Sequence, residues 1–297
     1  FGSCSQRKLP QPLWPVIAAH EPDFFIWAGD IVYNDTTDPA KMARKYQEQF
    51  QQADYAAFRE EFRILGTWDD HDYGANNAGK DFPAKAAAQR ALLDFLEEAP
   101  DSPRRQQAGV YASYDLGEPG RLVRLILLDL RYHRDDPGAD ADPLGPAQWA
   151  WLADRLRHSP AQVHLIVSSI QVLIDDSPYE CWRQFPAARR RLLALIGDSR
   201  APGVILCSGD RHIAELHRRN DTAVDYPLYD LTSSSMTHPW RNAPLEQSPG
   251  RVGPLIRRRN YGLIAVDWQT GRLRLAIGLR DGTFSIDEQV ALDDLTP

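Results

Sequence analysis

Apolar runs of strand length alternate with helical patterns along the chain. Strands are predicted at residues 24–28, 63–67, 110–116, 122–130, 164–170, 204–208, 228–232, 263–268, 272–279 and 283–289. Helices are predicted at residues 38–62, 83–98 and 146–158, each with a proline at or near its start. This alternation predicts an α/β fold. Because helical patterns are scarce in the last third of the chain, part of the sheet is expected to be mixed or antiparallel.

Two stretches have the composition of irregular loops, residues 134–145 and 237–254. Neither reads as a domain linker, so we expect a single domain spanning residues 1–297, with long loops of the kind that often border a site. The longest apolar runs, such as residues 125–128, have strand length. No run of 18 or more apolar residues predicts a membrane span.

Composition narrows the class of protein. The chain has 297 residues, of which 43% are hydrophobic and 25% charged, enough for a sizeable core. Its net charge of −7 argues against a non-specific nucleic-acid binder, which needs a basic face. Anionic substrates stay open, because bound metal ions can reverse a local field. With three cysteines, Cys4, Cys181 and Cys207, at least one thiol lies outside any intramolecular disulfide.

Polar side chains follow the predicted strands at the points where the strands end. Cys4 follows residues 1–3, and the segments 29–33, 69–72, 129–131 and 208–212 follow four apolar runs. In open α/β sheets, ligands bind outside the carboxyl ends of the strands. We therefore expect these side chains to converge.

Each of these pieces has an ordinary alternative explanation. An aspartate at a strand end is usually a turn former or a helix cap, and a buried cysteine is usually a small hydrophobic residue. However, three carboxylates and a histidine in residues 69–72 would repel one another unless a cation lay among them. Five such strand ends in one chain favour a metal site.

The blocks resemble those of the binuclear metallophosphoesterase superfamily in order and strand-end placement, although several residue types differ. The differences resemble one branch, the alkaline phosphatase D (PhoD-like) family. Its pattern matches Phe1–Cys4, Gly29–Tyr33, Trp68–Asp72 followed by Asn76-Asn77, Asp129–Arg131 and Ser208–His212, in that order. The resemblance covers essentially the whole chain.

The resemblance implies a four-layer α/β/β/α metallophosphatase sandwich with mixed sheets and a centre holding iron and calcium. The implied Fe³⁺ ligands are Cys4, Asp30, Tyr33 and His212. This mostly anionic set of mixed softness suits a trivalent or transition metal. Asp30 would bridge to one or two Ca²⁺ ions held also by Asp70 and Asp210, since carboxylate oxygens suit hard cations. Mg²⁺, Mn²⁺ or Zn²⁺ are the alternatives.

The resemblance also implies a mechanism. Two metal ions roughly 3.5–4 Å apart would hold the phosphoryl group and activate a water molecule. His71 would protonate the leaving oxygen or stabilise its charge, and Asp72 would orient His71. Asn76 or Asn77 would bind a phosphate oxygen.

Several other residues allow two interpretations. Arg131 either binds phosphate through two hydrogen bonds or pairs with Asp129. Gln171 is either a support for the site or an ordinary polar residue at a strand end. Trp182 and Trp240 either face substrate or pack in the core, and core packing is the commoner role.

The resulting expectation is a phosphoester hydrolase acting on small phosphomonoesters or phosphodiesters. One alternative is a phospholipase D-like diesterase acting on lipid head groups, and another is a metal- or phosphate-binding protein without catalysis. The resemblance implies a periplasmic or extracellular location. The chain begins with Phe1, so a signal segment is not visible in it. No feature of the sequence indicates an oligomeric state.

Overall fold

Short, fully apolar runs form the centre of the larger sheet of the computed structural model, which describes residues 1–297. Strands β5 (Val163–Val167) and β6 (Val204–Ser208) are buried at every position, as expected for parallel strands covered on both faces. This seven-stranded sheet has the order β3-β4-β5-β6-β8-β7-β9. Its other strands are β3 (Ala112–Glu118), β4 (Arg121–Leu127), β7 (Ala214–Arg219), β8 (Leu228–Ser233) and β9 (Arg251–Ile256). Strands β4, β5, β6 and β8 are parallel, whereas β3, β7 and β9 pair antiparallel with their neighbours.

The second β layer is assembled from both ends of the chain, as a two-stranded and a three-stranded sheet. Strand β1 (Phe24–Ala28) pairs parallel with β2 (Arg63–Thr67), and β10 (Asn260–Asp267), β11 (Arg272–Leu279) and β12 (Phe284–Ala291) form an antiparallel meander. The first two residues join these parts. The Gly2 N–H donates to Ile26 O at 3.1 Å, and the Gly262 N–H donates to Phe1 O at 2.9 Å. This pairing brings the start of the chain to the edge where β1 ends.

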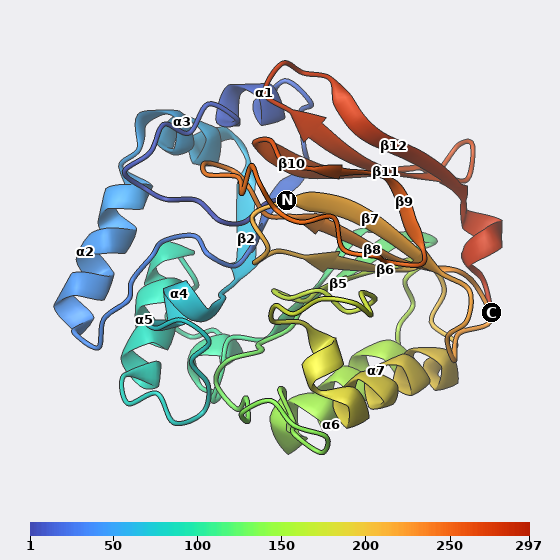
Figure 1. Cartoon of the computed structure of the whole chain (residues 1–297), viewed down its shortest axis with the longest axis horizontal. Helices are drawn as coiled ribbons and strands as arrows, with labels where there is room; N and C mark the ends of the chain where they lie inside the picture. The colour runs from blue at the N-terminus through green and yellow to red at the C-terminus, as the bar shows by residue number, and fades with distance from the viewer.

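Helices lie below the larger sheet and beside β1 and β2 (Figure 1). Helices α6 (Gly145–Arg157) and α7 (Pro186–Ser199) pack beneath the larger sheet, and the remaining helices gather beside β1 and β2. The latter are α1 (Trp14–Ala18), α2 (Pro39–Phe50), α3 (Ala53–Glu61), α4 (Asp70–Tyr73) and α5 (Lys85–Phe95). Short 3₁₀ turns lie at η1 (Pro103–Arg105), η2 (Trp182–Gln184) and η3 (Leu292–Leu295). The predicted α/β sandwich with mixed sheets is confirmed. None of the helices is both long and apolar enough to cross a bilayer.

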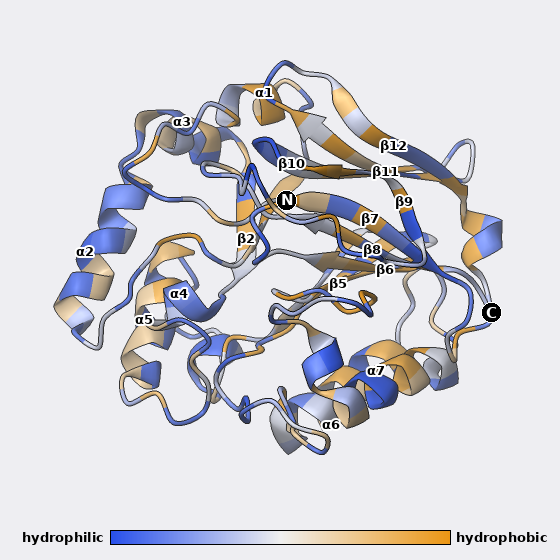
Figure 2. Cartoon of the chain, viewed as in Figure 1, coloured by the Kyte–Doolittle hydropathy of each residue, from blue (hydrophilic) through white to orange (hydrophobic).

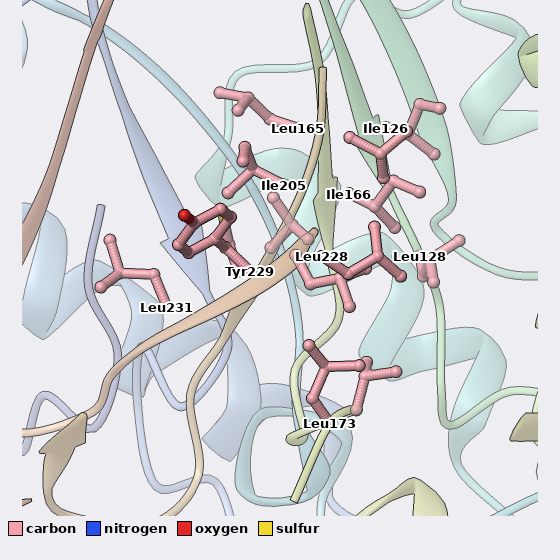
Figure 3. Close-up of a cluster of buried hydrophobic side chains, with 14 of the residues drawn as sticks. Ile126, Leu128, Leu165, Ile166, Leu173, Ile205, Leu228, Tyr229 and Leu231 are labelled. Atoms are coloured by element: carbon pink, nitrogen blue, oxygen red, sulfur yellow. The ribbon is translucent and has the colours of Figure 1, made fainter. Parts of the chain in front are cut away.

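The core follows from the strand pattern. Figure 2 shows hydrophobic positions concentrated along the strands, and Figure 3 shows aliphatic side chains of β4, β5, β6 and β8 packed together. A second cluster of aromatic rings surrounds Trp14, whose ring centroid lies 5.0 Å from that of Phe25 and 5.3 Å from that of Trp27. Burying each such side chain contributes about 1.5–3 kcal/mol, which fixes the strands that carry the polar residues described below.

The strands predicted at residues 110–116, 122–130 and 164–170 are found with their ends shifted by one to three residues. Two other predicted elements differ more from the structure. The helix expected over residues 38–62 is divided into α2 and α3, because Gln52 adopts an extended backbone and its side-chain amide donates to Arg7 O. The irregular loop expected over 237–254 ends earlier, since β9 begins at Arg251 and pairs with β7. Gly253 and Pro254 give β9 the composition of a loop. The strand can contain a proline because it lies at the edge of the sheet.

Candidate metal centre

The polar residues that follow β1, β2 and β6 meet at one edge of the sandwich. A glycine stands before Asp30 and another before Asp210, and each lets the backbone approach closely. A Cβ on Gly29, which has a φ of 94°, would lie 2.5 Å from Asp69 Cβ. A Cβ on Gly209 would lie 2.5 Å from Ser3 Oγ. The Gly-Asp pairs therefore allow three chain segments to come together.

The first group of side chains is the set predicted to hold iron. Cys4 Sγ lies 3.6 Å from Asp30 Oδ2, and Tyr33 Oη lies 3.3 Å from the same oxygen. Tyr33 Oη is also 3.3 Å from His212 Nε2. The donor atoms of Cys4, Asp30 and His212 all lie within 4.8 Å of one another. One thiol, one carboxylate, one phenol and one imidazole thus face a common point.

The tautomer of His212 follows from its surroundings. Its Nδ1 lies 3.0 Å from the carbonyl oxygen of His238, so Nδ1 carries the proton and donates it to that oxygen. The lone pair of the neutral ring is then on Nε2, which faces Tyr33 and Asp30. A backbone carbonyl that orients an imidazole in this way is the usual support for a metal-binding histidine.

A second group contains only oxygen donors. Carboxylate oxygens of Asp69, Asp70 and Asp210 lie within 4.8 Å of one another, and Asp30, Asp70 and His71 form an overlapping set. The Asp70 carboxylate accepts the backbone N–H groups of His71 at 2.8 Å and of Asn77 at 2.7 Å. These hydrogen bonds fix the side chain that lies between the two groups.

The electrostatics of the cluster call for positive charge. Burial raises the pKa of Asp30 well above its usual value, and the nearby carboxylates of Asp70 and Asp69 raise it further. Burial and neighbouring carboxylates raise the pKa of Asp210, Cys4 and Tyr33 in the same direction. Asp30 Oδ1 and Asp69 Oδ2 are buried without any hydrogen-bond partner. Cations at this position would supply those partners and offset the repulsion, so the donor set fits metal ions.

The backbone gives an independent indication of function. Cys4, Asp30, Asp210 and His212 all have left-handed backbones, with φ between 50° and 68°. Non-glycine residues adopt this region rarely, and such strain clusters at functional sites. The surrounding structure holds these residues in the unfavourable conformation that directs their side chains to the common point.

His71 lies at the exposed side of the cluster, but its partner is not the predicted one. The Asp72 carboxylate is fully buried and accepts the backbone N–H groups of Ile31 and Val32. It therefore fixes the turn after β1. The carboxylate that contacts His71 is Asp35, at 2.7 Å. Burial alone would lower the pKa of His71. The hydrogen bond to Asp35 and the negative charges of the nearby carboxylates outweigh burial and raise this pKa to about 9.

The predicted phosphate-binding residues divide into two kinds. Asn76 and Asn77 are exposed, and neither side-chain amide makes a hydrogen bond within the protein, so both are free to contact a ligand. Arg131, by contrast, has no exposed surface. Its guanidinium donates to Asp69 Oδ1 through Nε at 2.7 Å and to Glu180 Oε2 through Nη2 at 2.7 Å.

Arg131 thus occupies neither of its two expected positions. Only its backbone N–H contacts the Asp129 carboxylate, at 2.8 Å, and its side chain holds Asp69 at the edge of the cluster. Because the guanidinium is enclosed by these carboxylates, a direct contact with substrate is not supported. Arg131 instead links the cluster to the loop that carries Glu180.

Trp182, Gln171 and Trp240 lie in different surroundings. Trp182 is fully buried, and its Nε1–H donates to Ser168 Oγ, so it packs in the core. Gln171 is also buried and bonds to Glu215 and Arg211. Trp240 is partly exposed, and its backbone N–H donates to His212 O at 2.8 Å.

Sequence reasoning missed four residues of the site. Asp69 stands next to Asp70 in the same block, so its position was a usable signal. Asp35, Glu180 and His238 lie in loops without any recognisable pattern, and only the fold brings them to the cluster.

Comparison with solved structures supports the fold. The structure described as "Structure of PhoD" superposes with a TM-score of 0.78 at 18% sequence identity, covering 98% of this chain and 67% of that chain. A second, described as "GAP50 the anchor in the inner membrane complex of Plasmodium", has a TM-score of 0.65 at 12% identity, covering 98% of this chain and 85% of the other. The comparison with curated proteins gave no match.

The sequence itself supplies the family. The profile of the PhoD-like phosphatases matches residues 2–239, which contain every residue of the cluster. This match extends over well more than half of the chain and agrees with the order of the strand-end blocks. The chain belongs to the PhoD-like phosphatase family.

Proposed function

We propose that this protein is a metal-dependent phosphoester hydrolase. In this proposal Cys4, Asp30, Tyr33 and His212 hold Fe³⁺, and Asp30, Asp70 and Asp210 hold Ca²⁺, with Asp69 beside them. The observation that carries it is the convergence of these buried donors, with two carboxylate oxygens left unpartnered. A thiolate and a phenolate suit a trivalent metal, and a set made only of carboxylates suits a hard divalent cation.

Metal ions bound there would offset negative charge on the phosphoryl oxygens and lower the pKa of water. The protein's own groups supply the rest of the chemistry. His71 lies at the accessible side of the cluster, with Nδ1 held by Asp35. Its other nitrogen, Nε2, is the atom from which a proton would pass to the leaving oxygen. The free amides of Asn76 and Asn77 would orient the phosphoryl group by hydrogen bonds.

The substrate is proposed to be a small phosphomonoester or phosphodiester, with phospholipid head groups as the alternative. GAP50 is described as an anchor, so a binding protein without catalysis is the rival from a different class. The presence of a proton donor, His71, beside the cluster favours catalysis over binding alone. Membership in the family favours a location outside the cytoplasm.

The test compares the purified protein with Asp30→Asn and Asp210→Asn. The substrates are an aryl phosphate monoester, an aryl phosphate diester and phosphatidylcholine vesicles assayed for choline. We expect both substitutions to lower hydrolysis about a thousandfold or more, because each removes charge from the metal centre. The matched control is Asp94→Asn, which removes an exposed carboxylate on α5. Wild-type protein that contains metal and hydrolyses none of the three substrates would favour the binding protein instead.

A further inference from the structure

A pocket lined mostly by charged residues lies away from the candidate metal centre. It has a volume of about 240 Å³ and lies between the loop after β5, the first turns of α7 and the end of β7. Figure 1 shows α7 beneath the larger sheet, on the side opposite β10, β11 and β12. Strand β7 begins two residues after His212 and reaches this pocket at Arg219, about 17 Å further along at the usual rise of a strand. The pocket is therefore separate from the cluster.

The lining of this pocket is unusually rich in arginine for a chain with a net charge of −7. It contains Arg183, Arg189, Arg190 and Arg219 together with two carboxylates, Asp175 and Asp221. Four guanidinium groups against two carboxylates leave a local charge of about +2. The other lining residues are Leu173, Pro186, Leu193 and Thr222, none of them charged.

The two carboxylates are already committed to two of the arginines. Asp175 accepts from Arg189 Nη1 at 2.7 Å and from Arg219, while Asp221 accepts from Arg219 Nε at 2.6 Å. Arg189 Nε is buried without a hydrogen-bond partner. The ion pairs thus fix Arg189 and Arg219 in place and leave donor groups unused.

Arg183 and Arg190 form no ion pair and no hydrogen bond within the protein, although both line the pocket. Their side chains are exposed, so their guanidinium groups are free to close over a ligand. Planar guanidinium groups match tetrahedral oxyanions through paired hydrogen bonds, better than any other side chain. The surplus charge and the free donors therefore point to an anion.

We propose that this pocket binds a phosphate-type oxyanion, held by Arg183 and Arg190 and seated against Arg189. The size limits the ligand. A volume of about 240 Å³ far exceeds the share of about 30 Å³ that one water molecule occupies, but it falls below the range of about 300–1,000 Å³ typical of pockets for drug-sized ligands. The pocket suits inorganic phosphate or the phosphate group of a small organic molecule. This site is independent of whether the metal centre hydrolyses anything.

The experiment measures how many phosphate ions the purified protein binds. Equilibrium dialysis with labelled inorganic phosphate is carried out on the wild type, on the double variant Arg183→Gln/Arg190→Gln and on Asp30→Asn. The matched control, Arg157→Gln/Arg200→Gln, removes two exposed arginines outside the pocket. A phosphonate, whose P–C bond resists phosphoester hydrolysis, serves as the organic probe.

We expect the pocket variant to lose one equivalent of bound phosphate, or to bind that equivalent about tenfold more weakly for each arginine removed. The control and Asp30→Asn should keep this equivalent, and the pocket variant should hydrolyse aryl phosphate as the wild type does. The affinities to compare are those of the equivalent that the pocket variant loses. If this equivalent binds the phosphonate more tightly than phosphate, the pocket is assigned to organic phosphates, and the reverse order assigns it to the inorganic ion. The proposal is overturned if the pocket variant binds phosphate like the control, or if Asp30→Asn abolishes all binding. If the wild type hydrolyses none of the substrates but the pocket variant still loses its phosphate equivalent, the proposed function fails and the pocket proposal stands.

Discussion

His71 Nδ1 lies 2.7 Å from Oδ1 of Asp35, a residue 36 positions earlier in the chain. The imidazole ring also packs against Tyr33, with ring centroids 4.4 Å apart. These two contacts together set the orientation of the imidazole. The opposite ring nitrogen is therefore directed by two neighbours that belong to the segment after β1. A proton donor held in this way is expected to act on the leaving group.

Asp35→Asn and His71→Gln should both slow hydrolysis most for substrates with poor leaving groups. A positioned general acid contributes about 10²–10⁴-fold, and its contribution falls when the leaving oxygen needs no proton. We expect His71→Gln to lose about a hundredfold or more on an alkyl phosphate and much less on a nitrophenyl phosphate. Asp35→Asn should show the same leaving-group pattern with a smaller loss. Steady-state rates on both substrates measure it, with Asp38→Asn as the control on the same segment. Equal losses on both substrates would contradict the proposed role.

Tyr33→Phe should remove the phenolate contribution to the visible absorption of the iron-loaded protein. The Tyr33 oxygen lies 3.3 Å from both Asp30 Oδ2 and His212 Nε2, so a phenolate there would give a charge-transfer band with Fe³⁺. The measurement is an absorption spectrum together with elemental analysis of purified protein. Cys4→Ser should shift the band by removing the sulfur donor. Protein that contains two zinc ions and no iron would contradict the iron assignment, while leaving hydrolysis open.

Arg131→Met should destabilise the protein strongly. The side chain is fully buried and pairs with Asp69 and Glu180. Its loss leaves the Asp69 carboxylate with only the Ser169 hydroxyl as a side-chain donor, and Glu180 with only Arg134. Breaking such a pair typically lowers the free energy of unfolding by about 3–5 kcal/mol. Urea unfolding measures the change. Arg44→Met, which breaks an exposed pair with Glu48, should change it by less than about 1 kcal/mol. A similar small change for Arg131→Met would mean that the pair contributes little.

His164 should make the fold less stable in acid. Its Nδ1–H donates to Pro202 O at 2.7 Å, and its Nε2 lies 2.7 Å from Ser159 Oγ, so the buried ring is neutral. Burial lowers its pKa from 6.5 to about 4. The unfolded chain therefore binds this proton more readily. The stability is present above pH 6.5 and is lost as the pH falls from 6.5 towards 4, by on the order of 3 kcal/mol in all.

The check is urea unfolding of the wild type and His164→Gln between pH 7 and pH 4. The wild type should be the more stable protein at pH 7, and its advantage should shrink as the pH falls. His158→Gln, which changes an exposed histidine, should follow the wild-type curve. If the curves of the wild type and His164→Gln stay parallel across this range, His164 does not contribute the acid sensitivity.

The fold could be predicted largely from local patterns. The runs at residues 204–208 and 272–279 became β6 and β11 with the same bounds, because apolar periodicity and turn residues are properties of neighbouring positions. The division of the helix over 38–62 could not be predicted, since it depends on a hydrogen bond from Gln52 to Arg7, 45 residues away. Strand β9 was missed because Gly253 and Pro254 give it the composition of a loop, and it becomes a strand by pairing with β7.

The same division holds for the cluster. The order of residues is enough to show which chemical groups are available. Cys4, Asp30, Tyr33 and His212 lie in the segments that follow strands, so their grouping follows from sheet topology. The partners that support these groups can be identified only in the folded chain. Arg131 meets Glu180 across 49 residues, and the ring of His71 meets Asp35 rather than nearby Asp72. Such contacts depend on how separate loops run in space, and no local periodicity encodes that path.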